Sequence, residues 1–140
     1  MNHERAKADT LLLMSRLLAR RSQTTLFDQV RTVGLVLPGV ESATKYDGSP
    51  VLKVGGAFMA GVATHPSAEP ETLVVRSGFE ERELLLEEAP DTYYVTDHYR
   101  KHPVVLVRLS RLDTDALRDL LSMSWRLTMA KGQRRAQQAR

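Results

Sequence analysis

Residues 50–64 read PVLKVGGAFMAGVAT, two apolar segments joined by a pair of glycines. The first segment, Val51–Val54, has the β-branched and alternating character of a strand. Gly55 and Gly56 can both adopt the positive φ angles that tight hairpin turns require. The stretch therefore predicts a β-hairpin in which Ala57–Thr64 pairs antiparallel with the first segment.

Four more segments outside this hairpin are predicted to be strands, because they are apolar and bounded by turn-forming residues. They are Ala43–Tyr46, Thr72–Arg76, Thr92–Val95 and Val104–Leu109. The last of them is almost continuously apolar, which is typical of a strand at the centre of a sheet. The segment Thr96–Pro103 is predicted to be a charged, aromatic loop.

Four other segments are predicted to be helical, and in all but Phe79–Glu88 apolar residues recur at helical spacing. These are Ala6–Arg21, Thr25–Val36, Phe79–Glu88 and a C-terminal segment that begins at Asp113 or Thr114 and ends near Ala130. Because helices lie at both ends of a group of strands, the sequence favours an α+β fold in which an antiparallel sheet packs against helices.

The positive charge of the chain lies at its two ends. The 140 residues carry a net charge of +3. Residues 1–22 hold five basic and two acidic side chains, and residues 131–140 hold four basic and no acidic ones, so residues 23–130 carry a net charge of −4. We interpret these parts as an amphipathic helical extension (1–22), one domain of ordinary size (23–130) and a basic flexible tail (131–140).

The composition excludes several classes of protein. The chain has no cysteine, which excludes disulfide scaffolds, cysteine-ligated metals and thiol nucleophiles. No apolar run approaches the roughly 20 residues of a membrane span, and the N-terminal run is too short for a signal peptide. We therefore expect no membrane association and a cytoplasmic location.

The sequence offers little for catalysis or metal binding. His98 and His102 have the spacing of metal ligands on a helix, but Pro103 favours a loop, in which that spacing does not align two imidazoles. No nucleophile elbow, phosphate-binding loop or dinucleotide fingerprint occurs. We therefore expect no catalytic residue, no metal and no cofactor.

The strongest polar cluster is the run Tyr99, Arg100, Lys101 and His102. Tyrosine offers a face on which a base can stack, and arginine and lysine can contact phosphates. This combination is typical of grooves that bind single-stranded nucleic acid.

Three more basic residues alternate with apolar neighbours in the predicted strands, namely Lys53, Arg76 and Arg108. If these strands share one sheet, the three side chains point to its open face and form a cationic patch there. The alternative is the ordinary polar face of an antiparallel sheet that is exposed on one side.

Motifs spread over residues 24–131 resemble, in their order and spacing, those of the MmcQ/YjbR family. The matching elements are Leu37–Glu41, Pro50–Gly56 with Phe58, Leu73–Arg76, Tyr93–Thr96, His102, Val104–Leu109, Leu117–Leu121 and Ser124–Trp125. Two features depart from the family pattern. Pro103 stands where an aromatic residue often follows the histidine, and residues 1–22 lie outside the match.

The resemblance implies a frataxin-like, double-wing sandwich and a role in DNA binding through a basic sheet face and hairpins. The helix predicted over residues 1–22 from its apolar pattern is an addition to this fold. We therefore predict a non-enzymatic DNA-binding protein. The alternative is a protein-interaction or self-association module with no nucleic-acid role, whose second copy would bind through the N-terminal helix. A carrier of a small ligand is a third possibility.

Overall fold

The computed structural model describes residues 10–14 and 26–138, with side chains in the second range as far as residue 132. Residues 10–14 are helical, and Leu11, Leu12, Leu13 and Met14 are all more than half exposed. The rest of the predicted helical extension over residues 1–22 lies outside the described residues.

The described part of the chain contains an antiparallel sheet of six strands in the order β1-β2-β3-β4-β6-β5. The strands are β1 (Val40–Thr44), β2 (Pro50–Val54), β3 (Ala57–Val62), β4 (Thr72–Arg76), β5 (Tyr93–Tyr94) and β6 (Val104–Arg108). The α+β fold with an antiparallel sheet is therefore confirmed. The strand predicted to be central, β6, lies between β4 and β5.

The glycine hairpin forms as predicted. Gly55 and Gly56 have φ angles of 57° and 76°, and they join β2 to β3. Positive φ at both turn residues matches the twist of the flanking strands. The register shifts between Leu52 and Lys53, so a bulge lies in the middle of this hairpin.

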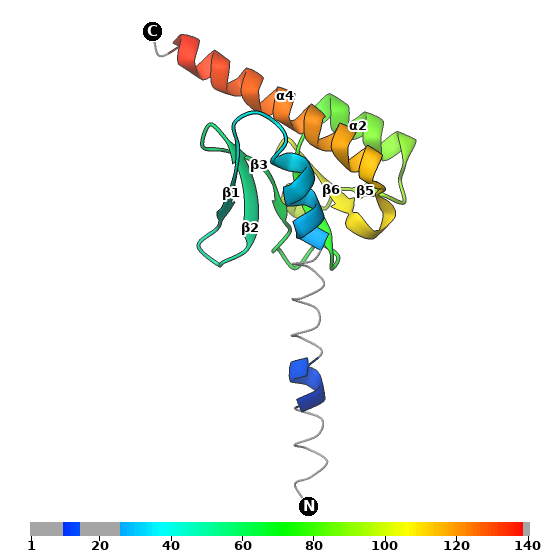
Figure 1. Cartoon of the computed structure of the whole chain (residues 1–140). Helices are drawn as coiled ribbons and strands as arrows, with labels where there is room; N and C mark the ends of the chain where they lie inside the picture. Colours follow the sequence, from blue (N-terminus) through cyan, green and yellow to red (C-terminus); the bar gives the residue numbers. More distant parts are fainter. Residues whose placement is uncertain (1–9, 15–25, 139–140) are drawn as a thin grey trace, which may run out of the picture.

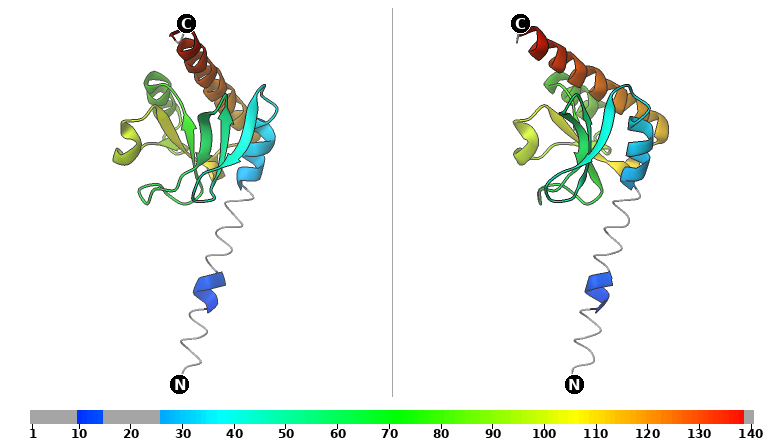
Figure 2. Two further views of the ribbon diagram at one scale, coloured as in Figure 1. Left: turned by 90° about the vertical axis from the view of Figure 1, so that its left-hand side faces the viewer. Right: turned by 60° about the vertical axis from the view of Figure 1, so that its left-hand side comes forward.

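Helices cover one face of the sheet. Besides residues 10–14, the described helices are a segment over residues 26–34, α2 (Phe79–Glu88), α3 (Asp97–Arg100) and α4 (Thr114–Gln138), with a 3₁₀ turn at Leu109–Arg111. Figure 1 looks onto the layer that contains α4 and the helix over residues 26–34. The right-hand view of Figure 2 shows these two on one side of the sheet and the short α3 on the other.

The main core lies between the sheet and the helix layer. Alternate strand residues such as Leu52, Met59, Leu73 and Val105 meet Leu121 of α4 there, all of them fully buried. The Ser124 hydroxyl of α4 donates a hydrogen bond to the carbonyl of Met59 (3.1 Å), which joins helix and strand inside the core. Burial of this apolar surface is the main source of stability.

Strand β1 begins three residues earlier than predicted. It covers Val40–Thr44, because the turn that follows is longer than expected: the N–H of Lys45 bonds to the carbonyl of Ser49 (2.9 Å). The Asp47 carboxylate accepts hydrogen bonds from the N–H (2.9 Å) and hydroxyl (2.6 Å) of Ser49. These bonds hold the turn, and the bond from the Ser49 hydroxyl, followed by the bond from its N–H, lowers the pKa of Asp47.

Two other predictions were wrong. The segment Thr96–Pro103 is not all loop, because α3 forms one helical turn in it. The flexible tail predicted over residues 131–140 begins too early, because α4 continues to Gln138. Apart from Gly132, this stretch consists of alanine, lysine, arginine and glutamine, which are strong helix formers. Of the helices described, none has the length and apolar character needed to cross a membrane.

Candidate functional site

The face of the sheet opposite the main helix layer carries a smaller core of its own. Val74, Val104 and Leu106 point to this side and are buried. Partly buried side chains of Phe58, Ala63, Ala68, Tyr94 and Tyr99 pack against them. Loop 63–71 and α3 therefore cover part of the face that the sequence predicts to be open.

A pocket of about 400 Å³ lies on this face. It is lined by Lys45, Phe58, Val74, Arg76, His98, Tyr99, His102, Pro103, Val104 and Lys131. Three of these side chains are cations, two are imidazoles and two are other aromatic rings. Within the described part of the chain, no carboxylate contributes to the lining. We call this set of residues the basic pocket.

Two of the pocket cations are held at opposite ends of β3. The Nζ of Lys45 is 3.5 Å from the carbonyl oxygen of Val62, and it lies 5.9 Å from the centre of the Phe58 ring. The Nε of Arg76 donates to the carbonyl of Phe58 (2.7 Å). Backbone atoms thus fix the position of both cations, while the Phe58 ring lies between the two ends.

The wall formed by α3 contains a cluster of rings. The imidazoles of His65 and His98 are stacked, with centroids 3.4 Å apart and planes 8° apart. The Tyr99 ring meets His98 edge-on at 4.8 Å, and its hydroxyl accepts a bond from the N–H of His65 (3.4 Å). Loss of hydration lowers the pKa of His98, and the charges of His65 and His102 lower it further.

Arg82 of α2 holds the chain segment that follows α3, which also lines the pocket. Its side chain is buried, and its Nη1 donates to the carbonyls of His102 (3.0 Å) and Val104 (3.3 Å). The guanidinium also lies over the ring of Phe79, 5.1 Å from its centre. Arg82 therefore fixes the turn that carries His102 and Pro103 into the pocket.

Arg108 lies outside the basic pocket. Arg76 faces Val104, and Arg108 faces Thr72, at opposite ends of the paired strands β4 and β6. Four residues along a strand correspond to about 13 Å. The single cationic patch predicted from Lys53, Arg76 and Arg108 therefore does not form, although alternation turns all three away from the main core.

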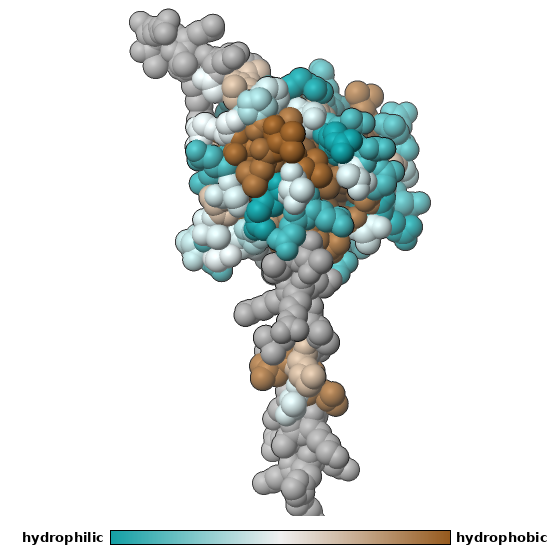
Figure 3. Space-filling model, viewed as in Figure 1, coloured by the Kyte–Doolittle hydropathy of each residue, from teal (hydrophilic) through white to brown (hydrophobic). Residues whose placement is uncertain are grey.

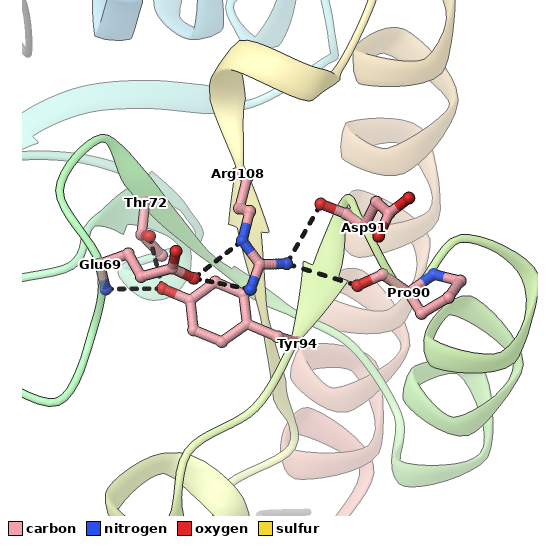
Figure 4. Close-up of polar contacts among 6 residues, drawn as sticks. All are labelled: Glu69, Thr72, Pro90, Asp91, Tyr94 and Arg108. Atoms are coloured by element: carbon pink, nitrogen blue, oxygen red, sulfur yellow. Dashed lines mark hydrogen bonds and ion pairs between the residues drawn. The ribbon is translucent and has the colours of Figure 1, made fainter.

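Figure 4 shows that the guanidinium of Arg108 is engaged on several sides. Its Nε and Nη2 bond to one carboxylate oxygen of Glu69 at 2.8 and 2.7 Å, and its Nη1 donates to the carbonyls of Asp91 (3.1 Å) and Pro90 (3.4 Å). It also lies 4.2 Å from the centre of the Tyr94 ring. Arg108 thus links loop 63–71 to residues 90 and 91, which precede β5.

Tyr94 completes this link. Its hydroxyl accepts a bond from the N–H of Glu69 (2.8 Å) and shares a second bond with the Thr72 hydroxyl (2.6 Å). We name the group Glu69, Thr72, Tyr94 and Arg108 the arginine clamp. Its bonds are directed inward to the protein, so we do not include Arg108 in the proposed binding surface.

The remaining predicted site residues are dispersed around the pocket. Lys53 faces Glu41 across β1 and β2. Arg100 forms an ion pair with Asp97 (3.4 Å), and Lys101 is exposed in the turn after α3.

The structure thus brings together only Arg76, Tyr99 and His102 of the predicted set. It adds Lys45 and Lys131, which sequence reasoning did not single out. Lys45 belonged to the predicted strand Ala43–Tyr46 and Lys131 to the predicted tail, and no spacing rule links the two.

Three or more metal-ligating side chains do not gather anywhere in the described residues. The His98 ring stacks on the ring of His65, and His102 lies in the turn that follows α3. Among the described residues, the two histidines therefore have no further ligands of the kind that a zinc site requires.

A hydrophobic patch lies on the other side of the molecule, at the end of the helix over residues 26–34 (Figure 3). Leu35 and Val36 are exposed there, Val36 by 82%. A groove of about 440 Å³ adjoins them and is lined by Val33, Val36, Leu37 and residues of the first turns of α4. Exposed apolar surface of this kind is typical of contact sites.

Comparison with solved structures finds the crystal structure of Deinococcus radiodurans protein DR2400, which carries a DUF419 domain. It is 27% identical to this chain, covers 76% of it over 80% of its own length, and gives a TM-score of 0.61. A comparison with curated proteins finds no match. The family model described as YjbR matches residues 35–127, which include every strand and most of α4. The chain therefore belongs to the YjbR family.

Proposed function

We propose that this protein is a non-enzymatic, cytoplasmic DNA-binding protein and that the basic pocket is its binding site. One observation carries the proposal: Lys45, Arg76 and Lys131 converge on a pocket whose described lining contains no carboxylate. Lysine and arginine contacts to phosphates supply most of the sequence-independent affinity of proteins for nucleic acid.

The distribution of charge supports this assignment. Residues 23–130 carry a net charge of −4, so a general attraction of the domain for polyanions does not explain binding. Asp97, which lies next to the pocket residue His98, is paired with Arg100, and Glu69 is paired with Arg108 in the arginine clamp. A polyanion is therefore attracted to the pocket and repelled by most of the remaining surface.

The lining favours binding over turnover. His98 and His102 are the titratable groups that could act as a base, but the described lining holds neither a carboxylate to orient them nor a serine to activate. The Tyr99 hydroxyl is engaged with the backbone of His65. We therefore assign no reaction to this site.

Removal of the three pocket charges tests the proposal. The variant Lys45→Gln, Arg76→Gln, Lys131→Gln keeps polar side chains of similar length but loses three cations. For the unaltered chain, three phosphate contacts on a single strand give a log–log salt slope of about −2, from about −0.7 per contact. We expect the variant to have a slope near zero and an affinity at about 50 mM salt that is weaker by roughly two orders of magnitude, measured by fluorescence anisotropy.

A matched control removes the same charge elsewhere. Arg111, Arg118 and Arg126 are exposed and lie outside the pocket, so their replacement by glutamine changes the net charge equally. This control is expected to keep the slope of the unaltered chain. Equal losses in both variants, or no binding by the unaltered chain at low salt, would contradict the proposal.

A second candidate function, self-association, is favoured by the exposure of Leu11, Leu12, Leu13 and Met14. Four consecutive apolar residues with most of their surface in contact with water are costly, at about 25 cal/mol per Å². We propose that this segment contacts a second copy of the chain.

Sedimentation equilibrium tests this candidate. The full chain is expected to form dimers at micromolar concentration, and the variant Leu12→Asp, Leu13→Asp to be monomeric with an unchanged unfolding transition. Leu84→Asp serves as control, because Leu84 is equally exposed on α2. A monomeric full chain, or a dimer that survives the double substitution, would rule out this contact.

A further inference from the structure

We infer that the basic pocket receives one unpaired nucleotide of a nucleic-acid strand, with its base against the apolar wall and its flanking phosphates on the cations. This inference rests on the proposed function and narrows its ligand from DNA in general to an unpaired strand. Three features of the pocket support it: its size, the division of its lining and the separation of its cations.

The size of the pocket fits one nucleotide. Its volume of about 400 Å³ lies at the lower end of the range of small-molecule sites, about 300–1,000 Å³. A duplex presents only the edges of its bases in the grooves, so a base can enter a cavity only after it leaves the stack. An unpaired strand has no such cost.

The lining is divided between an apolar and a charged part. Phe58, Val74, Pro103 and Val104 form a continuous apolar wall, since Phe58 packs on the small core that contains Val74 and Val104. The Tyr99 ring adds a second aromatic surface from α3. Aromatic side chains stack on bases of any sequence, which suits a strand bound without sequence preference.

The separation of the cations favours a strand over a free nucleotide. Lys45 is held at Val62 and Arg76 at Phe58, four residues apart on β3. On a regular strand this spacing is about 13 Å, and the bulge opposite Leu52 and Lys53 shortens it. A free nucleotide carries phosphate at one end only, whereas a strand has phosphates on both sides of each base and can place one on each cation. Lys131 of α4 contributes a third charge.

The probe for this inference is an oligothymidylate of about twelve nucleotides with one central 2-aminopurine, titrated with the full chain. We expect binding to change the 2-aminopurine fluorescence severalfold, because the base leaves water for the apolar wall. The same probe annealed to its complement is expected to bind at least tenfold more weakly and without this change. Thymidine monophosphate is expected to compete at least tenfold less well than the oligonucleotide.

Phe58→Leu provides an independent variant that keeps apolar volume but removes the ring. We expect about tenfold weaker binding of the single strand, no change in 2-aminopurine fluorescence and an unchanged salt slope, since the phosphate contacts remain. Tyr46→Leu is the control, because Tyr46 is a fully exposed aromatic residue outside the pocket. Circular dichroism verifies that both variants are folded.

The outcomes separate this inference from the proposed function. Equal binding of duplex and single strand, both weakened by loss of the three pocket charges, would leave the proposed function intact and overturn the inference. Thymidine monophosphate that competes as well as the strand would also overturn it. Failure of both oligonucleotides to bind would overturn both, whatever the behaviour of Phe58→Leu.

Discussion

Replacement of Arg108 by alanine is expected to lower the free energy of unfolding by about 2–3 kcal/mol and to leave nucleic-acid binding unchanged. Hydrogen bonds of a charged group contribute about 1.5–3 kcal/mol, and a cation over an aromatic ring adds roughly 0.5–1 kcal/mol. Arg108 makes both kinds of contact, with Glu69, two backbone carbonyls and the Tyr94 ring. Part of this sum is lost to solvent, because the side chain is partly exposed.

Urea denaturation of matched variants measures the effect. Glu69→Gln removes only the ion pair and keeps the backbone N–H that bonds to Tyr94, so it is expected to cost about 1 kcal/mol or less. Lys53→Ala alters the charge by the same amount as Arg108→Ala, but on a side chain outside the arginine clamp. It is expected to change stability by less than about 0.5 kcal/mol.

The opposite result would restore the role predicted from sequence. If Arg108→Ala leaves the unfolding transition in place but reduces the salt slope by about 0.7–0.9, Arg108 contacts a phosphate. The arginine clamp would then be a weak arrangement that opens when nucleic acid binds.

The position and the partners of Arg108 show what strand periodicity can and cannot predict. Alternation within Val104–Leu109 places the side chain on the face away from Val105 and Val107, and the structure confirms this. Its partner Glu69 lies 39 residues away in the sequence, in a loop without regular structure. Nothing in the local pattern around either residue indicates that they meet.

The elements with strong local signals were predicted well for physical reasons. Helix α2 forms over its predicted range, Phe79–Glu88, and β4 also has its predicted bounds. Strand β1 was displaced because the extent of a turn depends on hydrogen bonds such as those of Asp47, which composition alone does not reveal. Helix α3 was missed because four residues are too few to show a helical period.

The basic pocket could be predicted only in part. Arg76, Tyr99 and His102 were candidates because charge and aromatic character are visible in sequence. Lys45 and Lys131 come from the turn after β1 and from α4, and they converge only when the sheet and the helix layer have assembled. Sites of this kind follow from tertiary structure and have no sequence motif of their own.

Replacement of Arg82 by methionine is expected to have the largest effect on stability, a loss of about 3 kcal/mol. Arg82 is buried, and its guanidinium satisfies the carbonyls of His102 and Val104. A buried charge is expensive, and an apolar residue of similar volume sometimes replaces an ion pair without loss. Here the buried carbonyl of Val104 stays in place and loses the Arg82 donor, which costs about 1–3 kcal/mol, whereas the carbonyl of His102 keeps the N–H of Val104 (2.8 Å). Loss of the cation over the Phe79 ring adds roughly 0.5–1 kcal/mol.

The same substitution is expected to weaken nucleic-acid binding, because the turn that contains His102 and Pro103 forms one wall of the basic pocket. Arg82→Lys keeps the charge but loses the planar group that reaches two carbonyls, so an intermediate loss of stability is expected.

Arg118→Met is the control. Arg118 is exposed and bonds only to Asp115 among the described residues, so its loss should cost less than about 0.5 kcal/mol. If Arg82→Met proves as stable as the unaltered chain, water or a shift of the turn satisfies the carbonyls. Affinity measured on that folded variant then decides whether the turn must be held rigid: an unchanged salt slope and affinity would mean that the pocket needs its cations but not this support.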